Sequence, residues 1–491
     1  MKNMIMRFTA LSLAILISLQ SFSFCGFYVA KADANLFNNK SEVIIVRDGI
    51  HNVITMSSDF QGNMRDFAMV VPVPVVLKEA DIKVVDRRVF DVLNEYSAPR
   101  LVEYYDQNPC ARLEDESNSF LFDAVMAAPT MLGNVAREKK DFGVTVEAQY
   151  QIEEYDILIL SATESTGLKD WLIINGYRIP ASAEEVLQPY IKSNMKFFVV
   201  KVNMDKMQNS NFQYLRPLQI SFDHIKFMLP LRLGMANSQG SQDMIVYGFS
   251  RTGRIECTNY RTVKLPTERN IPLYVQAKFG DFYKALFEKS YLAEGRNAVF
   301  LEYAWNVSPY SPNPHCDPCV GPPPVNQDFV QAGVNWLNEA TQPSSVFFTR
   351  LHVRYSRDKF PADLQFQVTP NDENFQCRYI LTHPATGPFD CEEAQNYLDA
   401  LYDRRKREID EVYALTGWSD EGSRNYQNEF VPQMKSRHEP HKKNEVPLVS
   451  PQDDGPKGPP AFLVSLFFMT LVSWFVFSRV GTRWLRSLAD N

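Results

Sequence analysis

Hydrophobic residues gather at the two ends of the chain, in uncharged runs unlike the alternating patterns between them. Near the N-terminus, the apolar run 8–19 (FTALSLAILISL) follows Lys2 and Arg7. A positively charged start, an apolar run of this length and small residues after it are typical of a secretory signal peptide. The pattern predicts cleavage after Ser23 and a signal peptide of residues 1–23. An uncleaved N-terminal anchor is the alternative.

The second apolar run, residues 461–478 (AFLVSLFFMTLVSWFVFS), contains no charged residue. As a helix it would be about 27 Å long, close to the roughly 30 Å hydrocarbon core of a bilayer. Two aspartates precede it, and three arginines follow it within residues 479–491. By the positive-inside rule we expect a single transmembrane helix with the C-terminus inside and the preceding chain outside the cytoplasm. A buried core helix is the alternative, which the Pro-Pro start and the basic flank disfavour.

Between these runs, strand and helix periodicities are interspersed without a regular order. The β-rich runs 42–47 and 52–57 are separated by Asp48-Gly49, which predicts a hairpin. Because there is no regular βαβ alternation, the pattern predicts an α+β fold with largely antiparallel sheets and interspersed helices. Further strands are predicted in 66–73, 143–152, 155–162, 196–204, 218–222, 244–250, 299–305, 346–355 and 378–381, and helices in 86–96, 182–194, 282–292 and 390–417.

The pattern changes again after the last predicted helix. From residue 420 to residue 460 the chain is polar and rich in proline, a composition that cannot bury a core and predicts a disordered stalk. Within the last helix, we expect the charged run 403–408 (DRRKRE) to be a solvated face. The predicted organisation is a signal peptide (1–23), an extracytoplasmic α+β domain with length enough for two lobes (24–419), the stalk (420–460), the transmembrane helix (461–478) and an Arg-rich cytoplasmic tail (479–491).

The composition of the chain limits the classes of partner that it is expected to bind. Of the 491 residues, 45% are hydrophobic and 22% charged, as in an ordinary globular protein, and the net charge is −7 at pH 7. An acidic chain without a basic patch is not expected to bind nucleic acid. The expected partners are therefore the lipid bilayer, through residues 461–478, and a protein or glycan.

The cysteines are the main source of candidate chemistry. An exported chain favours disulfides, and seven cysteines leave at least one unpaired or paired between chains. We expect at least two disulfides, with Cys316 and Cys319 oxidised, either to each other or to Cys391. The disulfide candidates are Cys25, Cys110, Cys257, Cys316, Cys319, Cys377 and Cys391.

Cys316 and Cys319 form a Cys-x-x-Cys motif that follows His315. Such a motif can be a structural disulfide, part of a zinc site or a redox dithiol. The Gly-Pro-Pro-Pro that follows excludes the helix on which a thioredoxin-type site depends, and no second Cys-x-x-Cys offers further zinc ligands. We therefore expect a structural disulfide, with no metal and no cofactor.

Arg350, His352 and Arg354 lie on one face of the predicted strand 346–355, because side chains alternate with a period of two. A polar strand face is commonly the solvent side of a sheet, and a ligand-binding face is the alternative. Asp363 lies nearby in the sequence. No hydrolase elbow, phosphate loop, zinc-protease or calcium-loop motif is present. The favoured function is a non-catalytic binding or scaffolding module. The alternative is an extracytoplasmic enzyme or metal-binding protein that uses this face or the Cys316–Cys319 loop.

Short motifs along most of the chain form an ordered set. They are 25–33 (CGFYVAKAD), 66–74 (DFAMVVPVP), 98–104 (APRLVEY), 175–177 (NGY), 229–234 (LPLRLG), 258–262 (TNYRT), 316–319 (CDPC), 349–355 (TRLHVRY) and 415–418 (LTGW). The set resembles the bacterial domain-of-unknown-function family 2330 over about residues 25–418. The resemblance implies an exported, often membrane-tethered bacterial protein without an assigned activity or catalytic residues. It also implies that Cys257 and Cys377 are additions to the family pattern, and thus candidates for a further disulfide.

Overall fold

The structure is a computed structural model. It describes residues 41–57, 68–110, 142–177, 183–208, 215–236, 240–308, 323–338, 345–419 and 422–429, and short strands at 27–28, 37–38 and 60–61. The predicted signal peptide, Cys25, the His315–Cys319 motif, most of the predicted stalk and the predicted transmembrane segment lie outside these residues. Among the described residues, no helix is both long enough and apolar enough to cross a membrane.

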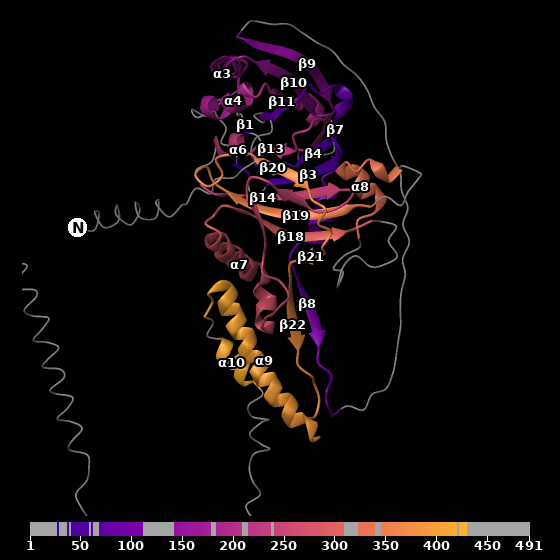
Figure 1. The fold of residues 1–491 in the computed structure, drawn as a ribbon, viewed down its shortest axis with the longest axis vertical. Helices are drawn as coiled ribbons and strands as arrows, with labels where there is room; N and C mark the ends of the chain where they lie inside the picture. The colour runs from indigo at the N-terminus through magenta and orange to yellow at the C-terminus, as the bar shows by residue number, and fades with distance from the viewer. Residues whose placement is uncertain are drawn as a thin grey trace, which may run out of the picture. The chain divides into compact units, whose positions relative to one another are not determined.

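A five-stranded antiparallel sheet carries two helices on one face, at the top of Figure 1. Its strands, in order, are β1 (Phe27–Tyr28), β6 (Ala68–Val73), β11 (Lys196–Val202), β10 (Tyr155–Ala162) and β9 (Val144–Ile152). Helices α3 (Ser165–Ile174) and α4 (Ala183–Lys192) bury their apolar sides against Val70, Phe197 and Val199. This covers one face of the sheet and leaves the other for a second layer.

That second layer is a mixed nine-stranded sheet. Its strands, in order, are β16 (Arg261–Lys264), β18 (Ala298–Asn306), β19 (Phe347–Tyr355), β14 (Gln242–Ser250), β3 (Ser41–Asp48), β4 (His51–Ser57), β12 (Leu218–Asp223) and β7 (Ile82–Val84), and β21 (Phe375–Gln376) pairs with β18. The predicted β3–β4 hairpin is present, with Gly49 at φ +58° in its turn. Residues 41–46 are all buried because both faces of the sheet are covered.

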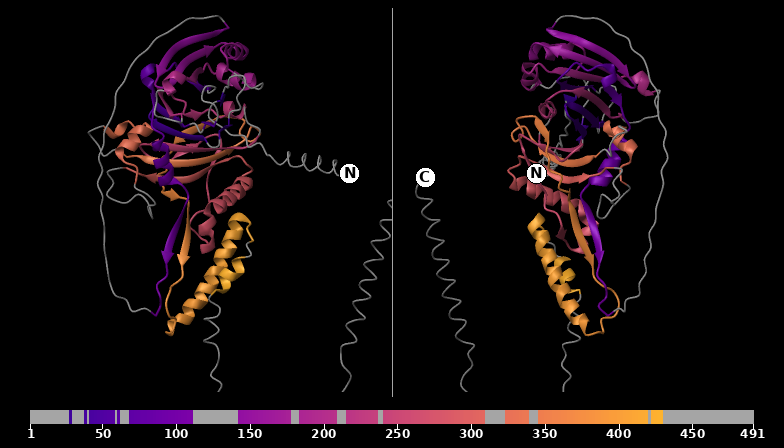
Figure 2. Two further views of the ribbon diagram at one scale, coloured as in Figure 1. Left: turned by 180° about the vertical axis from the view of Figure 1, so that it is seen from behind. Right: turned by 45° about the vertical axis from the view of Figure 1, so that its right-hand side comes forward.

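Alternate residues of β3 show the two covered faces. Val43 and Ile45 share a hydrophobic core with residues of the five-stranded sheet, such as Ile157 and Val200. Ile44 and Val46 pack on the opposite side, with α2 (Arg88–Ser97) and α8 (Asn326–Ala332). Helix α7 (Phe279–Ala293) packs against β18 and β19 through Phe287. Two packed sheets therefore lie between two sets of helices (Figure 2).

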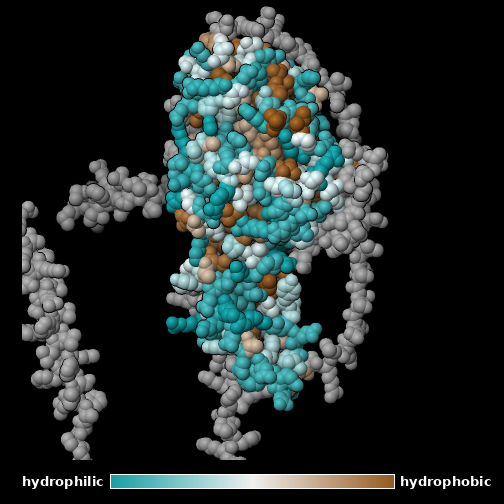
Figure 3. Space-filling model, viewed as in Figure 1, coloured by the Kyte–Doolittle hydropathy of each residue, from teal (hydrophilic) through white to brown (hydrophobic). Residues whose placement is uncertain are grey.

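A third part extends from the nine-stranded sheet, at the bottom of Figure 1. It contains an all-parallel sheet of β17 (Arg269–Asn270), β22 (Arg378–His383) and β8 (Arg100–Tyr105), together with α9 (Glu393–Thr416) and α10 (Gly422–Asn428). This sheet departs from the antiparallel pairing that the sequence led us to expect. The surface over α9 and α10 is largely hydrophilic, whereas hydrophobic residues reach the surface near the five-stranded sheet (Figure 3).

Two expectations for this part need correction. The charged run 403–408 is not wholly solvated, because Arg405 and Glu408 are buried where α10 packs on α9. The guanidinium of Arg405 lies 4.1 Å from the ring centroid of Tyr426, and the Tyr426 hydroxyl donates to Glu408 at 2.7 Å. Residues 422–428, which we placed in the stalk, therefore form part of the fold.

Most predicted elements are present. The predicted strands after the hairpin correspond, in order, to β6, β9, β10, β11, β12, β14, β18, β19 and β22, and the predicted helices to α2, α4, α7 and α9. The remaining elements are β2 (Phe37–Asn38), β5 (Phe60–Gln61), β13 (Met228–Leu229), β15 (Ile255–Cys257), β20 (Leu364–Val368), α5 (Met204–Gln208), α6 (Arg232–Ala236) and the 3-10 helices η2 (Glu79–Asp81), η3 (Leu273–Lys278) and η4 (Trp336–Asn338).

Candidate functional site

The predicted polar face of β19 is present, but helices cover it. Arg350, His352 and Arg354 lie on one side of the strand, as a period of two predicts. Arg350 Nη1 donates to Asn94 Oδ1 of α2 at 3.0 Å, and the ring of Phe287 from α7 stacks on His352 with centroids 3.9 Å apart. The expectation of a solvent-facing side is therefore wrong for Arg350 and His352.

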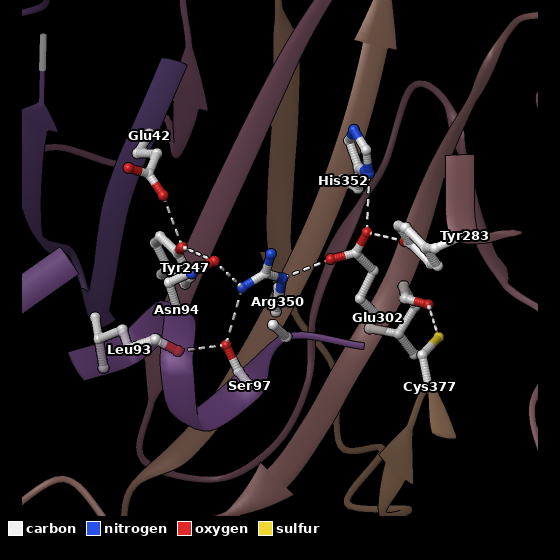
Figure 4. Close-up of polar contacts among 12 residues, drawn as sticks. Glu42, Leu93, Asn94, Ser97, Tyr247, Tyr283, Glu302, Arg350, His352 and Cys377 are labelled. Carbon is white, nitrogen blue, oxygen red and sulfur yellow. Dashed lines mark hydrogen bonds and ion pairs between the residues drawn. The ribbon is translucent and has the colours of Figure 1, made fainter. Parts of the chain in front are cut away.

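Glu302 of β18 lies at the centre of this face, with its side chain only 1% exposed. Its Oε2 accepts a hydrogen bond from Arg350 Nε at 2.5 Å. Its Oε1 lies 2.8 Å from His352 Nδ1 and also accepts from the Tyr283 hydroxyl (Figure 4). Three polar groups thus converge on one buried carboxylate, which offsets the cost of removing its charge from water.

The row of alternating charges continues along β19 toward the surface. The Nε2 atom of His352 lies 2.9 Å from Asp243 Oδ1. Arg354 binds the same carboxylate through two parallel bonds of 2.9 and 3.0 Å, and its Nη1 donates to Glu288 at 2.6 Å. Each cation of the row is therefore bound by a carboxylate of a neighbouring strand or helix.

These contacts set the protonation of the row. Burial alone would raise the pKa of Glu302 and Asp243, but the adjacent Arg350, His352 and Arg354 hold the pKa of Glu302 well below its usual range and that of Asp243 at about 2. Burial would lower the pKa of His352, yet the attraction of Glu302 and Asp243 is stronger, so the net shift is upward. The structure therefore favours an imidazolium held between two carboxylates.

Polar contacts also extend from Arg350 in the other direction. Ser97 Oγ lies 3.3 Å from Arg350 Nη1, and the Tyr247 hydroxyl donates to Glu42 Oε1 at 2.9 Å and lies 3.3 Å from Asn94 Oδ1 (Figure 4). We call the set Glu42, Asn94, Ser97, Asp243, Tyr247, Tyr283, Glu288, Glu302, Arg350, His352 and Arg354 the charge network. It connects four strands with α2 and α7 and has the character of a scaffold, because its charges bind one another.

An accessible cavity lies elsewhere, among α4, the β12–β13 connection, the start of α6 and β20. It has a volume of about 330 Å³, within the usual range for small-molecule sites. Half of the residues that line it are apolar, among them Met195, Phe227 and Phe366, and the ring centroids of these two phenylalanines lie 5.6 Å apart. We call this cavity the Arg232 pocket, after the cation in its wall.

Asp363 holds the walls of the Arg232 pocket together. Its Oδ1 accepts from the Tyr190 hydroxyl of α4 at 2.6 Å and from the backbone N–H groups of Leu231 and Arg232 at 2.9 and 3.2 Å. Burial raises the pKa of Asp363, although these donors and the charge of Arg232 act against the shift. Asp363 was noticed in the sequence, but Tyr190 is 173 residues away, so no local pattern indicated their contact.

Arg232 is the cation that faces Asp363. Its Nε lies 4.0 Å from Asp363 Oδ2, beyond hydrogen-bond distance, and is buried without a hydrogen-bond partner. Its side chain retains 27% exposure and makes no hydrogen bond to another described residue. Lys226 adds a second cation to the wall of the pocket. The arrangement combines apolar side chains with a partly exposed guanidinium whose Nη groups make no hydrogen bond to a described residue.

The cysteines that the structure describes settle part of the disulfide prediction. Cys110 and Cys391 form a disulfide with Cα atoms 5.4 Å apart, so Cys391 is not the partner of Cys316 or Cys319. Cys257 and Cys377 are buried free thiols, and the expectation that they form an added disulfide is wrong. Cys25, His315, Cys316 and Cys319 lie outside the described residues.

Within the described ranges, no group of three or more His, Cys, Asp or Glu side chains is arranged to hold a metal ion. Comparison with known families finds one match: the model of DUF2330, described as an uncharacterised protein conserved in bacteria, matches residues 19–367. No curated protein and no solved structure matches the chain.

Proposed function

Because the chain belongs to DUF2330, a bacterial family without an assigned activity, we propose its function from the structure: an exported, membrane-tethered binding module of the cell envelope. The binding is non-catalytic and takes place in the Arg232 pocket. Residues 1–23 direct export, and residues 461–478 hold the protein in the membrane with its C-terminus inside.

The Cys110–Cys391 disulfide supports the extracytoplasmic part of this proposal. Structural disulfides persist in oxidising compartments and are rare in the cytoplasm, where thiols are kept reduced. This bridge joins residues 281 positions apart, from the end of β8 to the start of α9. Two distant parts of the fold are therefore connected by a bond that suits an exported protein.

The Arg232 pocket is the observation that carries the binding function. Ligand sites typically combine apolar walls with a few converging polar groups and often lie between layers of a fold. Here α4, which covers the five-stranded sheet, and β20 both contribute residues to the lining of the pocket. Asp363 is engaged on Oδ1 by three protein donors, which gives it a structural role and favours a binding site over a reaction centre.

A pair of tryptophan substitutions tests the binding function. Gln365 is exposed and lines the Arg232 pocket, so Gln365→Trp should fill it and abolish binding of an apolar fluorescent dye. Gln149 is also exposed, on β9, and lies outside the pocket, so Gln149→Trp should leave dye binding unchanged. Equal dye binding by both variants would refute a binding function for this pocket.

Membrane topology needs a separate test. Protease added to spheroplasts should digest the region before residue 461 and spare a tag placed after Asn491. Protection of that region, together with loss of the tag, would contradict the proposed orientation.

A further inference from the structure

We propose that the ligand of the Arg232 pocket is an amphipathic monoanion: an aliphatic carboxylate whose head binds Arg232 and whose chain lies on the phenylalanine and methionine wall. This inference rests on the binding function proposed above and adds the chemical class of the ligand.

The charges in the pocket select the head group. The Arg232 guanidinium makes no hydrogen bond to a described residue, and its fork of N–H donors matches the two oxygens of a carboxylate. Asp363 Oδ2 lies 4.0 Å from Arg232 Nε, so a negative charge is already close to the binding position. Together, Arg232, Lys226 and Asp363 carry one net positive charge, which a single carboxylate neutralises, whereas the second charge of a phosphate monoester would be left without a counter-ion beside Asp363.

The apolar wall selects the rest of the ligand. Phe227, Phe366, Met195 and Met228 line the pocket, and methionine side chains adapt well to flexible apolar chains. Ile225, which is 80% exposed, also lines it. An exposed isoleucine next to buried aromatic rings provides an apolar path from the wall toward the surface.

The size of the pocket guides the choice of probe. A cavity of about 330 Å³ is at the small end of the usual range for small-molecule sites, so a short aliphatic carboxylate is the appropriate ligand to test. Octanoate has ten non-hydrogen atoms, a carboxylate and a seven-carbon tail, and therefore serves as the probe. A longer acyl chain would have to leave the pocket past Ile225.

The walls of the pocket are fixed before any ligand enters. Tyr190 and the backbone N–H groups of Leu231 and Arg232 converge on Asp363, and the Asn259 amide donates to the Asp363 carbonyl at 2.8 Å. These bonds hold α4, the start of α6 and the approach to β20 in one arrangement. Preorganised walls lower the entropic cost of binding.

The test uses the full chain in lipid nanodiscs, with empty nanodiscs as the background for partitioning. Octanoate and its neutral analogue octanamide are titrated into the wild type, Arg232→Gln, Arg232→Lys, Gln365→Trp and Gln149→Trp. Because charge-assisted hydrogen bonds are strong, Arg232→Gln should weaken octanoate binding roughly 10- to 100-fold and leave octanamide binding unchanged. Arg232→Lys, which keeps the charge, should retain part of the affinity for octanoate. Unfolding temperatures of all variants confirm that each is folded.

The outcomes separate this inference from the proposed function. Absence of octanoate binding, or equal octanoate affinity in the wild type and Arg232→Gln, overturns the carboxylate assignment. If octanamide binds as tightly as octanoate and Gln365→Trp abolishes both, the pocket is a binding site but its ligand is not an anion. If Gln365→Trp leaves octanoate binding intact, the pocket is not the site and the proposed function fails.

Discussion

Substitution of Glu302 by leucine should destabilise the fold strongly, because Glu302 is the counter-ion of a buried arginine. Leucine has a similar size but offers no acceptor to Arg350, His352 or Tyr283. The side chain of Arg350 is only 5% exposed and would remain charged in a site without its anion. Removal of one partner of a buried ion pair typically costs about 3–5 kcal/mol, and we expect Glu302→Leu to lie in this range.

Two further variants test the physical reason for this loss. Glu288→Leu removes a carboxylate of the same network whose side chain is 47% exposed, and exposed ion pairs contribute only about 0–1 kcal/mol. The double variant Glu302→Leu/Arg350→Met removes both buried charges. Since apolar replacement of a whole buried pair is often close to neutral, the double variant should recover much of the stability lost in Glu302→Leu.

The assay is denaturant unfolding at pH 7, followed by tryptophan fluorescence, on the wild type, the two single leucine variants, Arg350→Met and the double variant. The double-variant cycle isolates the coupling between Glu302 and Arg350. A loss below about 1 kcal/mol in Glu302→Leu would refute the role of this pair, given the 3–5 kcal/mol expected. The role of this pair would also be refuted if the double variant lost as much unfolding free energy as the two single variants together.

Three further predictions address other contacts. The pKa of His352 is raised in the fold, so its charge stabilises the protein fully below pH 6.5, and this stabilisation is lost as the pH rises through the folded pKa. Denaturant unfolding between pH 6 and 9 should show this loss of stability, and His352→Gln should abolish this pH dependence. In alkylation and mass spectrometry, Cys257 and Cys377 should be labelled only after unfolding, whereas Cys110 and Cys391 should be labelled only after reduction. Reduction of the Cys110–Cys391 disulfide should lower the free energy of unfolding by roughly 5 kcal/mol, because the bridge closes a long loop. Arg405→Ala should cost about 1.5–3 kcal/mol, the range of a hydrogen bond to a charged group, because Arg405 binds Glu429 and the ring of Tyr426. It should also expose α10 to proteolysis, and an unchanged cleavage pattern would contradict this.

Local periodicity accounts for the elements that the sequence predicted. The β3–β4 hairpin follows from two β-rich runs around Asp48-Gly49, and α9 ends where Gly417 adopts a left-handed conformation. Helix α3 was missed because Gly167 lies within it and weakens the helical pattern. The structure explains this glycine: a Cβ atom there would come within 2.2 Å of the Phe142 carbonyl oxygen.

Long-range pairing explains what the sequence could not predict. A period of two placed Arg350, His352 and Arg354 on one face. Their burial and their ion pairs depend on Glu302 and Asp243, which lie on other strands up to 111 residues away. The run 403–408 had the composition of a solvated face, yet Arg405 and Glu408 became buried because α10 packs there. A charged residue without a partner is expected to be exposed, and it is buried only where other groups of the fold pair with its charge.

The charge network and the Arg232 pocket have no residue in common, so their roles can be separated by experiment. The network lies on the face of β14 and β19 that α2 and α7 cover, whereas the pocket is formed by α4, α6 and β20. Glu302→Leu should therefore lower the free energy of unfolding and leave the octanoate affinity of the folded protein unchanged. Arg232→Gln should weaken octanoate binding and lower the free energy of unfolding less than Glu302→Leu does, because Arg232 lies 4.0 Å from the buried Asp363 carboxylate without a hydrogen bond to it. A change of octanoate affinity in Glu302→Leu, measured under conditions where the variant is folded, would show that the two regions are coupled through the sheet.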